Sequence, residues 1–156
     1  MFITDYKTYL EERELQKEHF GPTAILVTYN TMEDLYQILD TLEGQLTGTI
    51  HLSNSEISEM KPFIDQLKNM VGRVIINGVP TGVEVCYAMH HGGPYPATTA
   101  IDTTSVGVYA IKRFLKPVAF QDMPDELLPR PLKNKNHGKI IRIVNQEYTR
   151  EDISSP

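Results

Sequence analysis

The stretch from residue 77 to 99, NGVPTGVEVCYAMHHGGPYPATT, concentrates side chains that can serve as nucleophile, base or metal ligand. It holds Cys86, the single cysteine of the chain, and the adjacent pair His90 and His91. If the segment were helical, Cys86 and His90 would share one face, because residues four apart are neighbours on a helix. A nucleophilic cysteine needs such a base, since the thiolate is its reactive form. One interpretation is therefore a thiol activated by an imidazole.

The neighbours of Cys86 favour a different interpretation. Val83, Val85, Ala88 and Met89 surround it in the sequence. An apolar environment raises the pKa of a thiol, because burial disfavours the charged thiolate. We therefore expect Cys86 to be a small buried residue rather than a nucleophile. A free-standing cysteine and histidine hydrolase remains the weakest alternative.

The same stretch could be read as a metal site made by Glu84, Cys86, His90 and His91. Structural zinc sites need four ligands at recurring spacings, and the pattern C-x-x-x-H-H supplies too few. We expect no metal site.

Length, charge and cysteine content bound the remaining possibilities. The 156 residues fit one domain, and the formal net charge of −5 gives no electrostatic reason to expect a nucleic acid or an anionic membrane as partner. One cysteine excludes an intrachain disulfide and favours a reducing compartment. The N-terminus lacks a basic and then apolar signal pattern, and no apolar run approaches the ~20 residues that span a bilayer. We expect a cytoplasmic chain.

Three short apolar runs bounded by breakers predict strands, at residues 23–29, 46–52 and 72–77. Apolar residues three or four positions apart occur before the first strand and between the strands, which predicts three helices. These run from Asp5 to Lys17 with Thr4 as N-cap, from Thr31 to near Gly44, and from Ser55 to about Met70. Thr31 and Asp34 form an approximate capping box. This order of elements is typical of a parallel α/β sheet with crossover helices.

Beyond residue 77 the pattern changes. Residues 78–103 show neither helical nor strand periodicity. Helical spacing returns from Val106 to Phe114, and residues 116–121 are expected to form a short strand or an extended segment. Residues 138–149 alternate isoleucine with polar residues, which predicts one more strand at a sheet edge.

Two segments, ELQKEHFGPTAILVTYN and GRVIINGVPTGVEVCYAMHHGGPYPATT, resemble the aldehyde dehydrogenase superfamily. Within it they look most like the α-ketoglutaric semialdehyde (2,5-dioxovalerate) dehydrogenases and the NADP-dependent fatty aldehyde dehydrogenases. The motif E-x-F-G-P belongs to the superfamily, and the pattern NGVPTGVEV, HGGPYPAT and TSVG is characteristic of that branch. The resemblance runs from about Tyr6 to Tyr148.

The resemblance implies a fold and a division of the chain. We expect an α/β partial catalytic domain, with a mostly parallel sheet, crossover helices and a C-terminal edge strand. Residues 1–121 would be the C-terminal part of the catalytic domain, and residues 122–156 a surface connection and oligomerisation strand. In the family the dinucleotide-binding domain, the general-base glutamate and the nucleophilic cysteine all lie upstream of the matched segment. The absence of a G-x-G-x-x-G pattern here agrees with this, so we expect a truncated enzyme.

Three site residues follow from the resemblance. Glu18 matches the glutamate that accepts hydrogen bonds from the nicotinamide ribose, for which two acceptor oxygens suit two hydroxyls. Phe20 would pack beside the nicotinamide, and His91 matches the histidine expected near the catalytic thiol, where it could take a proton. Departures from the family pattern occur at His19 and near residues 102 and 103.

The expected function is that of the C-terminal segment of an NAD(P)-dependent aldehyde dehydrogenase. In the complete enzyme a thiolate attacks a small-molecule aldehyde, a hydride passes to NADP or NAD, and water releases the acid. We expect no turnover and no cofactor binding by this chain alone. We also expect a homo-oligomer or association with a full-length subunit, because a cut domain exposes apolar surface. The alternative is a truncated relative without enzymatic activity that associates with full-length subunits.

Overall fold

The computed structural model describes residues 1–154, and these divide into two units at the bond between Leu115 and Lys116. The expected functional boundary between residues 121 and 122 stays a prediction, and the last two residues of its second part lie outside the described range. Short parallel strand pairs with helices between them confirm the mixed α/β class.

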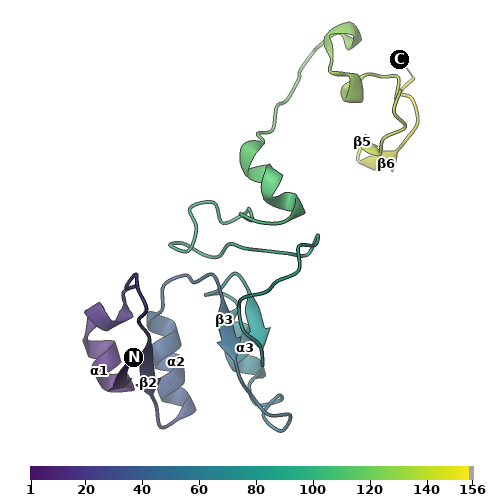
Figure 1. Ribbon diagram of the computed structural model, residues 1–156. Helices are drawn as coiled ribbons and strands as arrows, with labels where there is room; N and C mark the ends of the chain where they lie inside the picture. The colour runs from purple at the N-terminus through teal and green to yellow at the C-terminus, as the bar shows by residue number, and fades with distance from the viewer. Residues whose placement is uncertain (155–156) are drawn as a thin grey trace. The chain divides into compact units, whose positions relative to one another are not determined.

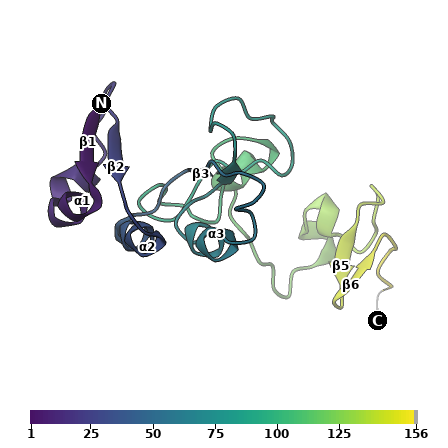
Figure 2. The ribbon, with the colours of Figure 1, turned by 90° about the horizontal axis from the view of Figure 1, so that it is seen from below.

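The first unit opens with strand β1 (Phe2–Asp5), which pairs in parallel with β2 (Ile25–Thr28); the two strands lie side by side in Figure 2. Helix α1 (Tyr6–Glu11) and a 3-10 helix (Arg13–Gln16) connect them. The prediction of one helix from Asp5 to Lys17 capped by Thr4 was wrong at both ends. Asp5 is the N-cap, and its carboxylate accepts hydrogen bonds from the amides of Lys7 and Thr8 at 3.0 and 3.1 Å. Residues 2–4 thus lie outside the helix and, together with Asp5, pair with β2.

Helix α2 (Met32–Thr41) begins as the sequence predicts. The Thr31 hydroxyl accepts a hydrogen bond from the amide of Asp34 at 3.2 Å, and the Asp34 carboxylate accepts one from the amide of Thr31 at 3.0 Å. The capping box is therefore confirmed. The helix ends at Thr41, and its C-cap Leu42 lies two positions before the expected stop at Gly44.

Strands β3 (Gly48–Ile50) and β4 (Val74–Ile76) form a second parallel pair, joined by helix α3 (Lys61–Leu67). The expected helix start at Ser55 was wrong. The carboxylate of Glu56 instead accepts hydrogen bonds from the amide and the hydroxyl of Ser53 at 2.8 and 2.6 Å, a local pattern that competes with helix. The α-helix begins only at the Lys61–Pro62 pair, where proline suits the first turn.

The three predicted strands do not form one sheet. β2 pairs with β1, which was not predicted, and β3 pairs with β4, so the described residues contain two separate parallel pairs. The apolar core lies on the second pair and comprises Leu39, Ile50, Phe63, Leu67 and Val71. Tyr36 of α2 meets Phe63 of α3 edge to face, with ring centroids 5.4 Å apart, and this contact helps to join the two helices.

A long irregular segment follows β4 and leads to a 3-10 helix at Val108–Phe114, drawn in green in Figure 1. The helical spacing from Val106 is therefore realised as the tighter 3-10 form. The segment 116–121 forms no strand, so the expected short strand is absent there.

The second unit contains 3-10 helices at Asp125–Leu127 and Arg130–Leu132, and an antiparallel pair of β5 (Arg142–Val144) and β6 (Glu147–Thr149). The prediction of one edge strand over residues 138–149 was wrong. Asn145 and Gln146 both have positive φ, 50° and 71°, and form a two-residue hairpin turn that folds the chain back on itself.

Candidate functional site

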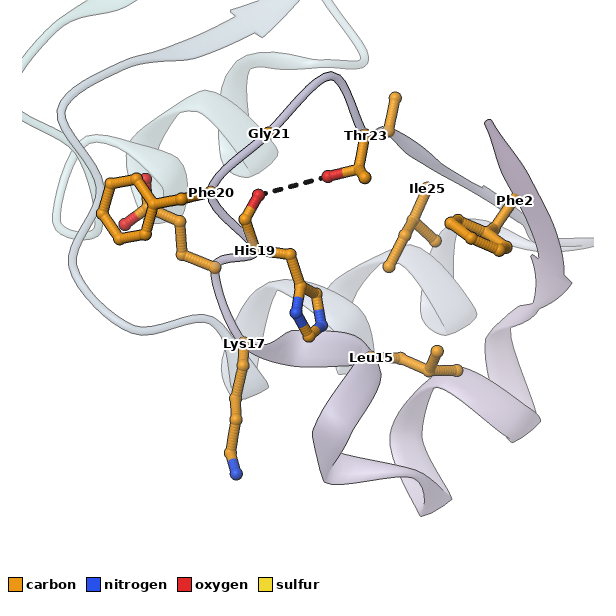
Figure 3. A pocket seen from close by; sticks show the side chains of 10 residues that line it. Phe2, Leu15, Lys17, His19, Phe20, Gly21, Thr23 and Ile25 are labelled. Carbon is orange, nitrogen blue, oxygen red and sulfur yellow. Dashed lines mark hydrogen bonds between the residues drawn. The ribbon is translucent and has the colours of Figure 1, made fainter.

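Glu18 and Phe20 lie on the loop between the first 3-10 helix and β2, where they line a cavity of about 840 Å³. In Figure 3 the side chains of Phe2, Leu15 and Ile25 form an apolar wall of this cavity, and the ring of Phe20 points away from that wall. The ring of Phe20 is 94% exposed, and Glu18 is also exposed. Both side chains are therefore accessible to a ligand.

The loop that carries these residues is held by its own hydrogen bonds. The Thr23 hydroxyl donates to the carbonyl of His19 at 3.2 Å, drawn as the dashed line in Figure 3. The Thr23 amide donates to the carbonyl of Gly21 at 2.8 Å, and Gly21 has φ of 149°, which favours glycine. The Gly21–Pro22 turn thus fixes where Glu18 and Phe20 are presented.

A second cavity brings Glu18 to the glycine- and proline-rich segment. This cavity of about 310 Å³ is lined by Glu18, by Gly44–Thr47 and by Pro96 and Ala97. The two halves of the sequence that carry the family resemblance therefore meet at one place in the first unit. Glu18 and the segment that follows His91 therefore border the same cavity.

Close backbone approaches hold this segment against the core. A Cβ added to Gly72 would collide with the carbonyl of Gly92, and one added to Gly93 would collide with the carbonyl of Gln45. A Cβ on Gly44 would likewise meet the carbonyl of Pro94. Glycine is required at these positions because no side chain fits between the backbones.

His91 is half-buried, and its backbone is fixed on both sides of Cα. Its amide donates to the Thr104 hydroxyl at 2.8 Å, and its carbonyl accepts from the Ser105 amide at 2.9 Å. His90 instead lines a small cavity of about 170 Å³ together with Asp102 and Lys112. The two adjacent histidines therefore have different surroundings, and only His91 is held by the Thr104–Ser105 pair.

Cys86 is exposed, so the expectation that it is buried was wrong. The segment is not helical: the Met89 amide donates to the Cys86 carbonyl at 3.2 Å and closes a turn. Its apolar neighbours are exposed as well, with Val85 65% and Tyr87 70% accessible. An apolar stretch in the sequence does not bury a residue when the segment folds as a surface loop.

Within the described residues, no group of three or more histidine, cysteine, aspartate or glutamate side chains could hold a metal ion. Among the same residues, no helix has both the length and the apolar content to cross a membrane.

Sequence reasoning missed the contribution of Thr104, whose side chain is 5% exposed and fully hydrogen-bonded. The available signal was the TSVG motif that begins at this residue. The motif was used only to support the family resemblance, because nothing local in it points to residue 91.

Comparison with known proteins addresses the resemblance directly. The chain is 42% identical over 137 residues to Alpha-ketoglutaric semialdehyde dehydrogenase 2 of Azospirillum brasilense, an alignment that covers 88% of this chain and 26% of that protein. It is 46% identical over 136 residues to Alpha-ketoglutaric semialdehyde dehydrogenase of Acinetobacter baylyi, with 87% and 26% covered. No protein-family model matches the chain. The chain thus spans about a quarter of the length of these curated relatives.

Proposed function

Because the resemblance of this chain to aldehyde dehydrogenases is confirmed, we propose that it supplies the C-terminal part of the catalytic domain of an NAD(P)-dependent enzyme that oxidises α-ketoglutaric semialdehyde or a similar aldehyde to the acid. The observation that carries the proposal is the meeting of Glu18 with Pro96 and Ala97 around one cavity. Segments far apart in the chain, each bearing family motifs, line this one cavity, and this supports a shared site.

The residues present fit the nicotinamide half of the cofactor. Glu18 offers two acceptor oxygens to a pair of ribose hydroxyls, and the exposed ring of Phe20 offers an apolar face to the nicotinamide. When bound, the cofactor accepts a hydride from the substrate. The chain has no glycine fingerprint for the pyrophosphate, so we expect this half-site to bind NADP weakly by itself.

In this proposal His91 acts close to the catalytic thiol. An imidazole can accept a proton from a thiol or from water in general base catalysis. The thiol comes from the portion of the enzyme that this chain does not match, and Cys86 takes no part. The isolated chain is therefore expected to show no dehydrogenase turnover.

Reconstitution tests the proposal. The part of the Acinetobacter baylyi enzyme that the alignment leaves unmatched, about three quarters of its length, would be co-expressed with this chain. We expect NADP reduction that depends on α-ketoglutaric semialdehyde in the mixture and in neither part alone. Glu18→Gln should raise KM for NADP, whereas Glu11→Gln, an exposed glutamate in α1, should not. A complex that forms and stays inactive would refute the proposal.

A second candidate is a non-enzymatic partner of full-length subunits, favoured by the exposure of apolar side chains on the first strand pair. Phe2, Ile3 and Leu26 are 64%, 67% and 49% exposed. Such surface promotes association. Size-exclusion chromatography of this chain with the intact Acinetobacter baylyi enzyme distinguishes the two candidates. Co-elution with the intact enzyme, together with no activity in the reconstitution described above, favours the second candidate.

A further inference from the structure

We propose that Thr104 is a positioning residue that fixes His91 for its role beside the thiol, with Ser105 as its second arm. The inference rests on the proposed function for the role of His91. The clamp itself rests on the hydrogen bonds of the chain and can be tested separately.

Thr104 is unusual because it is a polar side chain with only 5% of its surface exposed. Its hydroxyl accepts a hydrogen bond from the His91 amide at 2.8 Å and donates one to the Val106 carbonyl at 2.7 Å. The Val106 amide adds a longer contact to the same oxygen at 3.4 Å. A hydroxyl is suited to this position because it can donate and accept at once.

Ser105 holds the other side of residue 91. Both its amide and its hydroxyl donate to the His91 carbonyl, at 2.9 and 3.0 Å. The amide and the carbonyl of His91 are therefore both bound to consecutive residues of a segment more than ten positions downstream. Rotation of either flanking peptide would break at least one of these hydrogen bonds.

The next two residues anchor the chain from the opposite direction. Gly92 lies against the backbone of Gly72, and Gly93 lies against that of Gln45, with no space for a Cβ at either contact. His91 thus sits between the Thr104–Ser105 clamp and the core. With the backbone fixed on both sides, the imidazole retains only its own side-chain rotations. A fixed backbone at His91 reduces the conformational entropy that is lost when the imidazole is oriented for the reaction.

Amide exchange and ring signals in the isolated chain test the clamp. Thr104→Val keeps the shape and removes the acceptor, so we expect the His91 amide to exchange about tenfold faster and its ring resonances to shift. Thr104→Ser keeps the hydroxyl and should restore both. Thr99→Val, an exposed threonine in the same segment, is the matched control, and the exposed His51 is the internal reference. An unchanged His91 amide and ring in Thr104→Val would overturn the clamp.

A merely structural threonine would lower the stability without affecting His91 selectively, so the urea midpoint is measured alongside. If Thr104→Val fails to fold, Ser105→Ala removes one of the two donors to the His91 carbonyl and should shift the same signals less. In the reconstituted enzyme, Thr104→Val should lower kcat and leave KM for NADP unchanged. Shifted His91 signals with unchanged kcat would show that Thr104 holds the His91 backbone but would overturn its positioning role in the reaction.

Discussion

Glu18 and Pro96 line one cavity of about 310 Å³, although they lie at opposite ends of the first unit's sequence. This arrangement depends on the loop between α2 and β3, because Gly44 and Gln45 line the same cavity and lie against the backbone of Pro94 and Gly93. The cavity joins the proposed cofactor residue to the segment that carries His91. Four predictions concern the close packing at Gly72, the capping box of α2, the hydrogen bonds of Asn136 in the second unit and the exposure of Cys86.

Gly72→Ala should separate the segment 91–97 from the core. A Cβ at residue 72 would collide with the carbonyl of Gly92, and backbone cannot yield as a flexible side chain can. We expect a loss of about 1–3 kcal/mol in the free energy of unfolding, measured in urea. Gly138→Ala is the control, because its Cβ would meet a side-chain atom of Ile140 at an ordinary van der Waals distance of 3.4 Å. Equal midpoints for the two variants would contradict the close packing.

The Asp34 carboxylate should make α2 sensitive to acid. Burial alone would raise its pKa, but hydrogen bonds from the amides of Asn30 and Thr31 outweigh this and hold the pKa below its ordinary value of 3.8. Since the folded-state pKa is the lower one, the stabilisation is present above pH 3.8 and is lost as the pH falls through the folded pKa.

Urea unfolding followed by circular dichroism from pH 7 to pH 2 measures this effect. The urea concentration at the midpoint of unfolding should decrease once the pH drops below about 4. Asp34→Asn should lower this midpoint at pH 7 and make it less dependent on pH. Glu33→Gln is the control, because Glu33 lies in the same helical turn without a part in the capping box. The same acid dependence in Asp34→Asn as in the wild type would exclude this explanation.

Asn136 should hold the second unit together. Its side chain is 6% exposed, accepts from the Ile140 amide at 3.1 Å, and donates to the carbonyls of Ile140 and Arg150 at 2.8 and 2.9 Å. Asn136→Ala leaves these groups unpaired, and we expect a cost of about 1–3 kcal/mol.

Loss of the amide signals of β5 and β6 under mild denaturant measures that cost. Asn134→Ala is the matched control, because Asn134 takes part through its backbone, which the substitution keeps. If both variants behaved alike, the side chain of Asn136 would not be the source of the stability.

The thiol of Cys86 should react at once with a disulfide reagent in the native chain, because it is exposed. The number of thiols titrated before and after denaturation measures this, and equal values are expected. In the reconstituted enzyme, Cys86→Ala should leave turnover within about twofold of the wild type, since a surface residue outside the site contributes little. Loss of turnover in Cys86→Ala would reopen the interpretation of Cys86 as the nucleophile.

Local structure was predictable where the deciding contacts lie within a few residues. Thr31 and Asp34 show this, because a capping box needs only a hydroxyl and a carboxylate three positions apart. The strand runs around Ile25, Thr49 and Ile75 were also found from composition and breakers. The prediction that a helix begins at Ser55 was wrong because Ser53 and Glu56 form a competing turn. Its hydrogen bonds join residues as close in the sequence as those of a helix cap, so the sequence pattern does not tell the two apart.

The sequence by itself determined the family resemblance, the capping box of α2 and the candidate residues Glu18, Phe20 and His91, because motifs and short-range hydrogen bonds are encoded in neighbouring positions. Only the tertiary structure decided that β2 pairs with β1, that Cys86 is exposed, and that Thr104 binds the backbone of His91. These outcomes depend on contacts between distant segments. Such contacts form when backbones meet without a side chain between them, as at Gly72 and Gly92, and no local pattern specifies which segments will meet.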